Sequence, residues 1–283
     1  MSVLSIQSRV IQGHVGNAAA VLPLQYLGHE VWAVDTVTFS NHPGRSKFRG
    51  RVTPPAEVAD LLLGLEEQEI FTRCQAVISG YLGDAGNTTA IAASVAAVKR
   101  ANPDALYLLD PVMGDHDVGD HGALYVRPTV PPAIRQDLLP IADIATPNQF
   151  ELEYLTGGPL ADTAAAIAAA RSLGPARVFV TSLKTPATEA GILETLMVDA
   201  NGAWLVRQPA FERRFDGSGD MFAALFLGHF LNSKDAVDAF GRACAGVALL
   251  LRQTMASGQL DIPLTSGIPS AVKESPAEVL KLS

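Results

Sequence analysis

The sequence contains little cysteine and no long apolar segment. Its two cysteines, Cys74 and Cys244, lie far apart in apolar surroundings without Cys-x-x-Cys spacing, so neither a cysteine metal site nor a redox pair is expected. No apolar run reaches the roughly 18 residues that a membrane-spanning helix needs, and the N-terminus lacks the basic and apolar regions of a signal peptide. We therefore expect a cytoplasmic protein with two buried, reduced thiols and no membrane contact.

Positive charge is also scarce. The 21 Lys and Arg residues against 29 Asp and Glu residues give a formal net charge of -8 at pH 7, which opposes binding to polyanions. The six histidines lack the spacing of zinc ligands. No Walker-type segment ending in GKS or GKT is present, and no GxGxxG segment follows the first apolar run. Nucleic acid, zinc and a nicotinamide cofactor are therefore not expected as partners.

Short apolar runs rich in Val, Ile and Leu alternate with helix-like stretches along most of the chain. The apolar runs cover residues 3–6, 31–34, 76–79, 105–109, 141–145 and 178–181, and the helix-like stretches cover residues 55–65, 88–101, 148–155 and 162–173. The apolar runs lack polar alternation, which is typical of strands buried on both faces of a parallel sheet. The polar residues Gln7, Ser8 and Arg9 predict that the first strand ends there in a loop.

The pattern changes towards the C-terminus. Residues 192–199 and 203–208 flank Asn201-Gly202, a pair typical of a tight hairpin turn, and helix-like stretches follow at 219–231 and 236–252. The sequence thus predicts a single α/β domain over residues 1–283, with an open, mostly parallel central sheet, helices on both faces and an antiparallel edge. Two long loops, residues 42–52 and 115–132, are candidates for lids.

The strongest chemical signal is the turn Gly217-Ser218-Gly219-Asp220, which leads directly into an apolar, helix-like stretch. The unpaired N–H groups of a first helical turn, together with small glycines, form a cradle for a phosphate. Asp220 would then lie beside the transferring phosphoryl group, where a carboxylate accepts the proton of an attacking hydroxyl. Taken alone, the same residues are also typical of an ordinary turn with an acidic residue near a helix N-terminus.

Acidic residues also follow two of the predicted strands. Asp110 and Asp115 come after the run 105–109, and Glu151 comes after the run 141–145. In an open parallel sheet, ligands bind outside the carboxyl ends of the strands, so these carboxylates and Asp220 are expected to converge on one crevice. Several acids near a triphosphate indicate Mg²⁺, which takes oxygen ligands and keeps several waters. Singly, each acid is equally typical of a helix cap or a loop contact.

Seven short motifs occur in a fixed order along the chain. They are residues 5–8 (SIQS), 13–17 (GHVGN), 39–42 (FSNH), 79–81 (SGY), 110–115 (DPVMGD), 146–148 (TPN) and 217–220 (GSGD). In this order the chain resembles the pyridoxal kinases of the ribokinase superfamily over nearly its whole length. The resemblance implies a ribokinase-like fold and ATP-dependent phosphorylation of the hydroxymethyl group of pyridoxal, with pyridoxine and pyridoxamine as further candidates, in vitamin B6 salvage. It also implies a homodimer that needs Mg²⁺, with K⁺ as a candidate second cation.

The resemblance assigns the vitamer side of the site to Ser8, Val15, His42, Tyr81 and Asp220. It implies that Ser8 hydrogen-bonds the pyridine ring and that Val15, His42 and Tyr81 shape the ring pocket. A neutral hydroxyl suits a ring nitrogen or phenolic oxygen, and an aromatic side chain adds stacking against a planar heterocycle. Without the resemblance, Ser8 is more typical of a strand-end cap and Tyr81 of a packing residue.

The resemblance assigns the nucleotide side to a second set of positions. They are Asp110, Asp115, Thr146, Asn148, Glu151 and Thr181, together with Gly217 and Gly219. Asp110 and Glu151 are the implied Mg²⁺ ligands. Asp220 matches the catalytic base, and Gly217, Ser218 and Gly219 match the anion hole that receives negative charge as the phosphoryl group moves.

Two positions depart from the family pattern. Pro43 stands where relatives usually have Thr, so a hydroxyl and a backbone N–H are lost and the local backbone is fixed. Asp216 stands where relatives often have an apolar residue that touches the substrate. The Asp216 carboxylate either lies near the substrate, where its charge favours a cationic vitamer such as pyridoxamine, or points to solvent. We expect it to point to solvent. Vitamer preference therefore stays open.

Two alternative functions share most of these features. A hydroxymethylpyrimidine kinase would have the same fold and the same Gly-Asp turn, but the segment Ser40-Asn41-His42 argues against it. A non-catalytic vitamer-binding protein would keep the pocket, but Asp220 within its glycine-rich turn argues against that reading.

Overall fold

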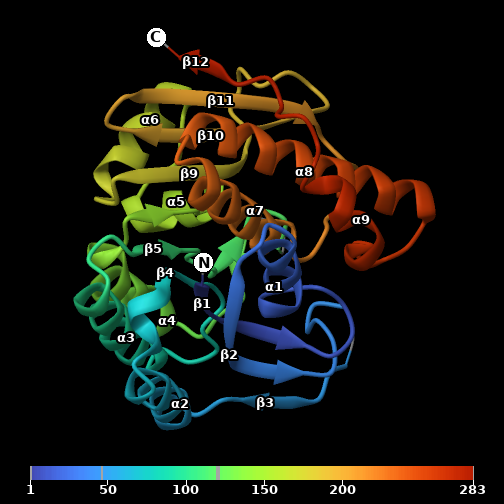
Figure 1. Cartoon of the computed structure of the whole chain (residues 1–283). Helices are drawn as coiled ribbons and strands as arrows, with labels where there is room; N and C mark the ends of the chain where they lie inside the picture. The colour runs from blue at the N-terminus through green and yellow to red at the C-terminus, as the bar shows by residue number, and fades with distance from the viewer. Residues whose placement is uncertain (1, 46, 119–121, 283) are drawn as a thin grey trace.

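A twisted central sheet organises the molecule (Figure 1). The structure is a computed structural model that describes residues 2–45, 47–118 and 122–282; part of the predicted lid at 115–132 thus lies outside the described residues. Within these residues the main sheet has ten strands, in the order β12-β11-β10-β9-β8-β5-β4-β1-β2-β3. They are β1 (Ser2–Val10), β2 (Glu30–Phe39), β3 (Gly50–Val52), β4 (Cys74–Ser79), β5 (Leu106–Leu109), β8 (Ile144–Ala145), β9 (Arg177–Leu183), β10 (Ile192–Asp199), β11 (Gly202–Pro209) and β12 (Leu280–Leu282).

Six neighbouring strands, from β2 through β9, run parallel, and antiparallel pairs lie at both edges. Parallel pairing joins β2 to β1, β1 to β4, β4 to β5, β5 to β8 and β8 to β9. The hairpin β10–β11 turns at Ala200 and Asn201, one residue before the predicted pair Asn201-Gly202, and adds the predicted antiparallel edge. The strand β3 forms a second antiparallel edge against β2, inside the segment that the sequence predicted to be a loop.

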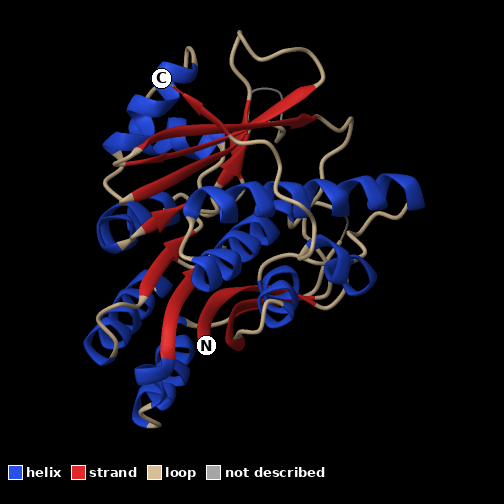
Figure 2. Ribbon diagram, turned by 45° about the horizontal axis from the view of Figure 1, so that its top comes forward, coloured by secondary structure: helices blue, strands red, loops and turns tan. Residues whose placement is uncertain are grey.

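Helices cover both faces of the sheet (Figure 2). They are α1 (Asn17–Tyr26), α2 (Pro55–Glu67), α3 (Asn87–Ala101), α4 (Val130–Ala133), α5 (Gln149–Thr156), α6 (Thr163–Ser172), α7 (Ser218–Ser233), α8 (Ala236–Ser257) and α9 (Leu264–Ala271). Helices α2, α3, α5 and α6 pack on one face, and α1, α7 and α8 pack on the other. The predicted α/β architecture is therefore confirmed.

Adjacent strand residues point to opposite hydrophobic cores. In β1, Val3 packs with α7 and α8 while Leu4 packs with the α2 and α3 side, and both side chains are fully buried. In β5, Leu108 and Leu109 are divided in the same way. Because both faces are buried, these strands contain apolar residues at consecutive positions, which explains the missing polar alternation in the sequence.

The first strand is longer than its polar residues predicted. β1 continues through Gln7, Ser8 and Arg9 to Val10, so the predicted loop at these residues is wrong. The Gln7 amide nitrogen donates to the Ser5 hydroxyl at 3.0 Å, which gives its buried amide group a partner inside the sheet. A buried polar side chain is tolerated in a strand when a neighbour accepts its hydrogen bond.

Smaller elements complete the described chain. The strands β6 (Gly114–Asp115) and β7 (Ala123–Leu124) form a separate two-stranded sheet within the predicted 115–132 loop region. Single helical turns lie at Ile70–Arg73, Ile134–Leu138 and Leu139–Ile141. Among the described helices, none combines the length and the apolar character that crossing a membrane requires.

Candidate active site

The predicted site residues lie on one edge of the sheet, where the parallel strands end. Ser8 is near the end of β1, Tyr81 follows β4, Asp110 follows β5 directly, Thr146 follows β8 and Thr181 is in β9. Three backbone hydrogen bonds keep the strand ends in register: Asp110 N–H to Ser79 O at 2.9 Å, Thr146 N–H to Leu109 O at 3.0 Å and Thr181 N–H to Pro147 O at 3.0 Å. The arrangement matches the position at which open parallel sheets bind ligands.

The glycine-rich turn lies directly against the loop after β1. Gly217 precedes α7 with φ of 86°, a left-handed conformation that favours glycine. A Cβ atom on Gly217 would lie 1.9 Å from the carbonyl oxygen of His14, so a side chain has no room there. The turn thus places the N-terminal N–H groups of the 16-residue helix α7 beside the loop after β1.

Asp220 lies in the first turn of α7, beside the backbone of Gly16. The backbone N–H groups of Gly16 and of Asp220 itself lie near its carboxylate and favour its charged form. Burial raises the pKa of the Asp220 carboxyl above its usual range, and the negative charge of Asp216 acts in the same direction. A carboxylate with a raised pKa is a better proton acceptor, which is the property that a general base needs.

Ser8 is the immediate neighbour of this arrangement on the vitamer side. A Cβ atom on Gly16, whose φ is 54°, would lie 2.4 Å from the Ser8 hydroxyl oxygen and 2.2 Å from the Ser8 carbonyl oxygen. The Gly16 backbone therefore lies between Ser8 and Asp220. The structure brings together the residue predicted to hold the pyridine ring and the predicted base.

Two of the acids predicted for the nucleotide side are buried. Asp110 is 6% exposed and Glu151 is 3% exposed. The Thr146 hydroxyl donates to Asp110 Oδ1 at 3.0 Å, and the Met113 N–H donates to Glu151 Oε1 at 2.8 Å. Burial, reinforced by the charge of Glu151, raises the pKa of Asp110, and burial raises the pKa of Glu151 as well. Both carboxylates are therefore costly to ionise without a counter-charge.

These two acids fit a divalent cation that also uses ligand oxygens from outside the protein. Within the described residues, no group of three or more His, Cys, Asp or Glu side chains forms a metal cage. Mg²⁺ is typically held by one or two carboxylates together with substrate phosphates and water, so a complete protein cage is not required. A cation beside Asp110 and Glu151 would supply the counter-charge that the raised pKa values indicate.

Asn148 has a structural role at the start of α5. Its side-chain oxygen accepts the Glu151 N–H at 2.9 Å, and Glu151 Oε2 accepts the Asn148 N–H at 2.9 Å, which forms a capping box. The Asn148 amide nitrogen also donates to the Gly114 carbonyl at 2.8 Å. Asn148 therefore fixes Glu151 relative to the segment that contains Asp115.

Two of the residues predicted for the vitamer side belong to a small apolar wall. Val15 and Tyr81 pack against the buried side chains of Val10, Val37 and Phe39. Burial raises the pKa of the Tyr81 phenol, so this group stays protonated at neutral pH. The wall provides an uncharged surface of the kind that planar heterocycles pack against.

His42 is a neutral imidazole at the rim of this wall. Its Nδ1 accepts the Gly44 N–H at 3.3 Å, and burial lowers the pKa of the ring below its usual value. The nearby carboxylate of Asp216, 3.5 Å from Nδ1, opposes this lowering without cancelling it. His42 therefore contributes a flat, uncharged ring.

Asp216 does not point to solvent, so that prediction is wrong. Its side chain is 14% exposed and its carboxylate lies 2.8 Å from Arg45 Nε and 3.6 Å from Arg214 Nε. Arg214 also lies 3.9 Å from Asp115 and holds its guanidinium 5.8 Å from the centre of the Tyr125 ring. Neither arginine belongs to the sequence motifs, and Arg45 is separated from Asp216 by 171 positions, so the sequence contained no signal for this contact.

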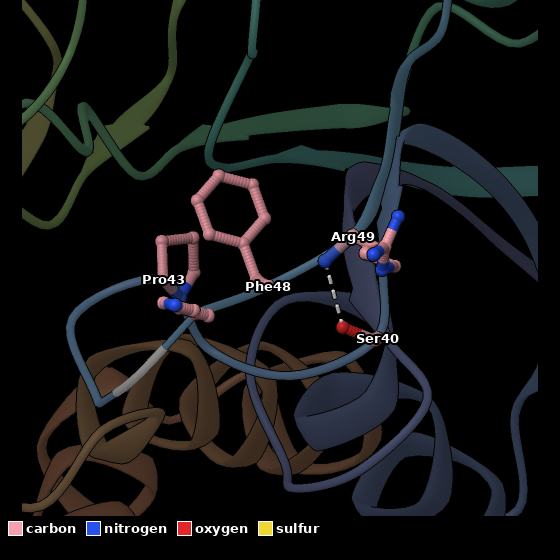
Figure 3. A pocket seen from close by; sticks show the side chains of 5 residues that line it. Ser40, Pro43, Phe48 and Arg49 are labelled. Carbon is pink, nitrogen blue, oxygen red and sulfur yellow. Dashed lines mark hydrogen bonds between the residues drawn. The ribbon is translucent and has the colours of Figure 1, made fainter.

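A pocket of about 680 Å³ opens beside the loop after β2 (Figure 3). Its lining residues are Ser40, Pro43, Lys47, Phe48 and Arg49. Figure 3 shows the rings of Pro43 and Phe48 standing side by side on this loop. The lining does not include Asp220, so this pocket is separate from the glycine-rich turn.

Known proteins resemble this chain in both sequence and structure. A family model described as phosphomethylpyrimidine kinase matches residues 57–265. Pyridoxal kinase PdxY of Corynebacterium diphtheriae is 46% identical over 265 residues, which cover 93% of this chain and 92% of that protein. Two structures of pyridoxal kinase from Leishmania donovani superpose with a TM-score of 0.90 over 100% of this chain and 99% of that chain. The complex with ADP and pyridoxine is 32% identical, and the complex with ADP and pyridoxamine is 33% identical.

Proposed function

Since the chain belongs to the phosphomethylpyrimidine kinase family and, within it, to the pyridoxal kinases, we propose a residue-level account of how it phosphorylates a B6 vitamer. The chain is an ATP-dependent kinase that transfers a phosphoryl group to the hydroxymethyl group of pyridoxal or a close vitamer. The observation that supports the account most directly is the contact of the Asp220 carboxylate with the Gly16 backbone, beside Ser8.

In the proposed reaction, Asp220 accepts the proton of the vitamer hydroxymethyl group. The hydroxymethyl oxygen attacks the γ-phosphorus of ATP, the bond between the γ-phosphorus and the bridging β,γ-oxygen breaks, and ADP leaves with the electron pair of that bond. The N–H groups of Gly217, Ser218 and Gly219 donate to the oxygens on which negative charge accumulates. The raised pKa of Asp220 favours the proton transfer.

Ser8, Val15, His42 and Tyr81 are proposed to hold the vitamer ring. The Ser8 hydroxyl hydrogen-bonds a polar ring atom, while Val15 and Tyr81 provide the apolar wall. The neutral imidazole of His42 closes the rim without adding charge. These contacts orient the hydroxymethyl group towards Asp220, which lies on the other side of Gly16.

Asp110, Asp115, Thr146, Asn148, Glu151 and Thr181 are proposed to form the nucleotide side. Asp110 and Glu151 would hold Mg²⁺, which would neutralise phosphate charge and orient the triphosphate when bound. Asn148 contributes through the capping box that positions Glu151. K⁺ is proposed as a second activating cation, and a cytoplasmic homodimer is proposed as the working form, both from the resemblance to pyridoxal kinases.

A phosphorylation assay with a panel of substrates tests this function. Wild-type protein is incubated with ATP, Mg²⁺ and either pyridoxal, pyridoxine, pyridoxamine or hydroxymethylpyrimidine, and ADP and phosphorylated product are both quantified. We expect a B6 vitamer to have the highest kcat/KM. A higher kcat/KM with hydroxymethylpyrimidine would favour the pyrimidine kinase that the description of the family model names, and vitamer binding without ADP formation would indicate a non-catalytic binding protein.

A further inference from the structure

Arg45 connects two carboxylates that lie on different segments of the chain. Its Nε donates to Asp216 Oδ2 at 2.8 Å, and its Nη1 donates to Asp261 Oδ1. The Arg45 side chain is 27% exposed, and the side chains of Asp216 and Asp261 are 14% and 27% exposed. A guanidinium that donates from two nitrogens to two carboxylates has a defined orientation, because both hydrogen bonds depend on the planar geometry of the group.

The bridge joins three segments of the chain. Arg45 lies in the vitamer-side loop, defined here as residues 40–45 and 47–49, between β2 and β3. Asp216 immediately precedes the glycine-rich turn, and Asp261 lies between α8 and α9. The loop that contains His42 and Pro43 is thus tied to the turn that contains the proposed anion hole.

Neighbouring contacts already fix the two carboxylate segments to each other. The guanidinium of Arg213 donates to the backbone carbonyls of Gln259 and Leu260, next to Asp261. The Arg213 guanidinium also lies 4.5 Å from the centre of the Phe215 ring, next to Asp216. Arg213 therefore holds these two segments together without Arg45. The additional effect of Arg45 is to attach the vitamer-side loop to both of them.

The same stretch of sequence offers an ion pair of a different kind for comparison. Arg51 Nη2 lies 2.8 Å from Glu57 Oε1, but the two side chains are 65% and 40% exposed. Exposed pairs of this kind contribute little to stability, because water competes for both charges. The partly buried, two-carboxylate geometry of Arg45 therefore predicts a stronger constraint on its loop than Arg51 exerts on β3.

We propose that Arg45 is a positioning residue that holds the vitamer-side loop against the catalytic turn through Asp216 and Asp261, and thereby sets the affinity for the vitamer. This inference rests on the proposed function, since it assigns His42 and Pro43 to the vitamer side. It also explains Asp216: the carboxylate is occupied by Arg45 and flanked by Arg214, so it serves as an anchor for the loop. Arg45 acts through the loop and has no role in proton or phosphoryl transfer.

Steady-state kinetics of Arg45→Gln, Arg45→Lys and the control Arg51→Gln test the proposal. We expect Arg45→Gln to raise the KM for the vitamer about tenfold or more, because both charge-assisted hydrogen bonds of Arg45 are lost. We expect kcat and the KM for ATP to stay near the wild-type values. Arg45→Lys keeps the charge and should recover part of the affinity, and Arg51→Gln should behave as wild type. A fall in kcat at unchanged vitamer KM would overturn the proposal.

Limited trypsin digestion reports on the loop without requiring catalysis. Lys47 and Arg49 are cleavage sites that remain in Arg45→Gln. Loss of the bridge should increase their cleavage rate about tenfold, since cleavage follows the population of the open form, and bound vitamer should reduce it. Arg51→Gln also removes one arginine from this stretch and should leave the rate at Lys47 unchanged. Equal rates in wild type and Arg45→Gln would contradict the proposal.

A double-mutant cycle tests whether Arg45 acts through Asp216. The variants Arg45→Gln, Asp216→Asn and the double variant are compared by their vitamer Kd. If the two residues form one unit, the double variant is no weaker than the weaker single variant, whereas additive losses would contradict the proposal. Failure of the proposed function would be recognised separately, because wild-type protein would then phosphorylate none of the vitamers.

Discussion

The Thr146 hydroxyl donates a hydrogen bond of 3.0 Å to Asp110 Oδ1 at the carboxyl ends of the neighbouring strands β5 and β8. This bond favours the charged form of Asp110, but burial and the nearby charges of Glu151 and Asp220 outweigh it, so the pKa of Asp110 is well above its usual range. Ionising Asp110 in the folded protein is therefore unfavourable unless a positive charge lies nearby. This unfavourable ionisation is what the proposed binding of Mg²⁺ beside Asp110 would relieve.

Replacing Asp110 by Asn should stabilise the protein in the absence of Mg²⁺. A carboxyl whose pKa is raised by folding makes its full contribution to stability below its unfolded pKa of about 4, and this contribution is lost as the pH rises through its folded pKa. At neutral pH, ionising Asp110 costs free energy in the folded protein, and Asn removes this cost. We therefore expect the melting temperature to rise by about 2–4 °C, which corresponds to about 1 kcal/mol in the free energy of unfolding. Differential scanning fluorimetry without divalent cations measures the change.

The same variant should respond less to Mg²⁺ in the presence of ADP. A ligand that binds only the folded state raises the melting temperature, so wild-type protein should gain more from Mg²⁺ than Asp110→Asn. Asp143→Asn is a suitable control, because Asp143 lies outside the proposed site and its side chain, which is 34% exposed, pairs with Lys99 at 2.8 Å. A destabilised Asp110→Asn variant with the full Mg²⁺ response would argue against Asp110 as a cation ligand.

Gly217→Ala should impair both folding and catalysis. The new Cβ would lie 1.9 Å from the His14 carbonyl oxygen, and the residue would keep a φ of 86°, so the turn or residues 14–15 must move. We expect a loss of about 2–4 kcal/mol in the free energy of unfolding and a fall in kcat, since the anion-hole N–H groups are displaced. Urea unfolding and initial rates measure the two effects.

Gly157→Ala provides a matched control for Gly217→Ala. Gly157 ends α5 with a φ of 85°, and a Cβ there meets no atom within 4 Å. This variant should show only the strain of a left-handed alanine, about 1 kcal/mol, with kcat unchanged. Equal effects of the two substitutions would mean that the close approach to His14 is unimportant.

His229 should make the protein less stable in mild acid. Burial lowers the pKa of its imidazole to about 4, and the charges of Arg242 and His29 act in the same direction against Asp238. Because the folded pKa lies below the unfolded value of about 6.5, this group's contribution is fully present above pH 6.5 and is lost as the pH falls towards 4. His229→Gln, which does not titrate, should lose less stability than wild type between about pH 7 and about pH 5.

Urea unfolding at both pH values gives the free energy of unfolding that each protein, wild type and His229→Gln, loses in acid. The test is the difference between these two losses. This difference is needed because the carboxyl groups of Asp110, Glu151 and Asp220 have raised pKa values and change stability in the opposite direction with pH. If wild type and His229→Gln lose the same free energy of unfolding in acid, His229 is not the group responsible.

The fold was predictable where local pattern and burial agree. Consecutive buried residues such as Val3 and Leu4 face different cores, so the apolar runs identified parallel strands directly. The prediction failed at Gln7, whose polarity suggested a loop, because its partner Ser5 lies within the same strand and is not recognisable from pattern. Helix α1 was not predicted; it contains Pro23, which is unfavourable within a helix, and it is stabilised by packing against α7.

The candidate site was predictable at its motifs and unpredictable at its ion pairs. Gly217 and Asp220 stand in one short segment with a recognisable physical role, and the structure places that segment beside Ser8 through Gly16. The pairing of Arg45 with Asp216 spans 171 positions and depends on where two loops meet, so no local pattern encodes it. That contact also explains why the expected solvent exposure of Asp216 was wrong.

The most direct test of the central claim is the activity of Asp220→Asn with its best vitamer, measured together with vitamer binding. Asn has nearly the same size and can still accept the Gly16 N–H, so the turn should be preserved. We predict that kcat falls by about 10²- to 10⁴-fold, the contribution typical of a general base. The vitamer Kd, measured by titration calorimetry, should stay close to the wild-type value. A variant that binds vitamer normally and retains kcat within about tenfold of wild type would contradict the assignment of Asp220 as the base.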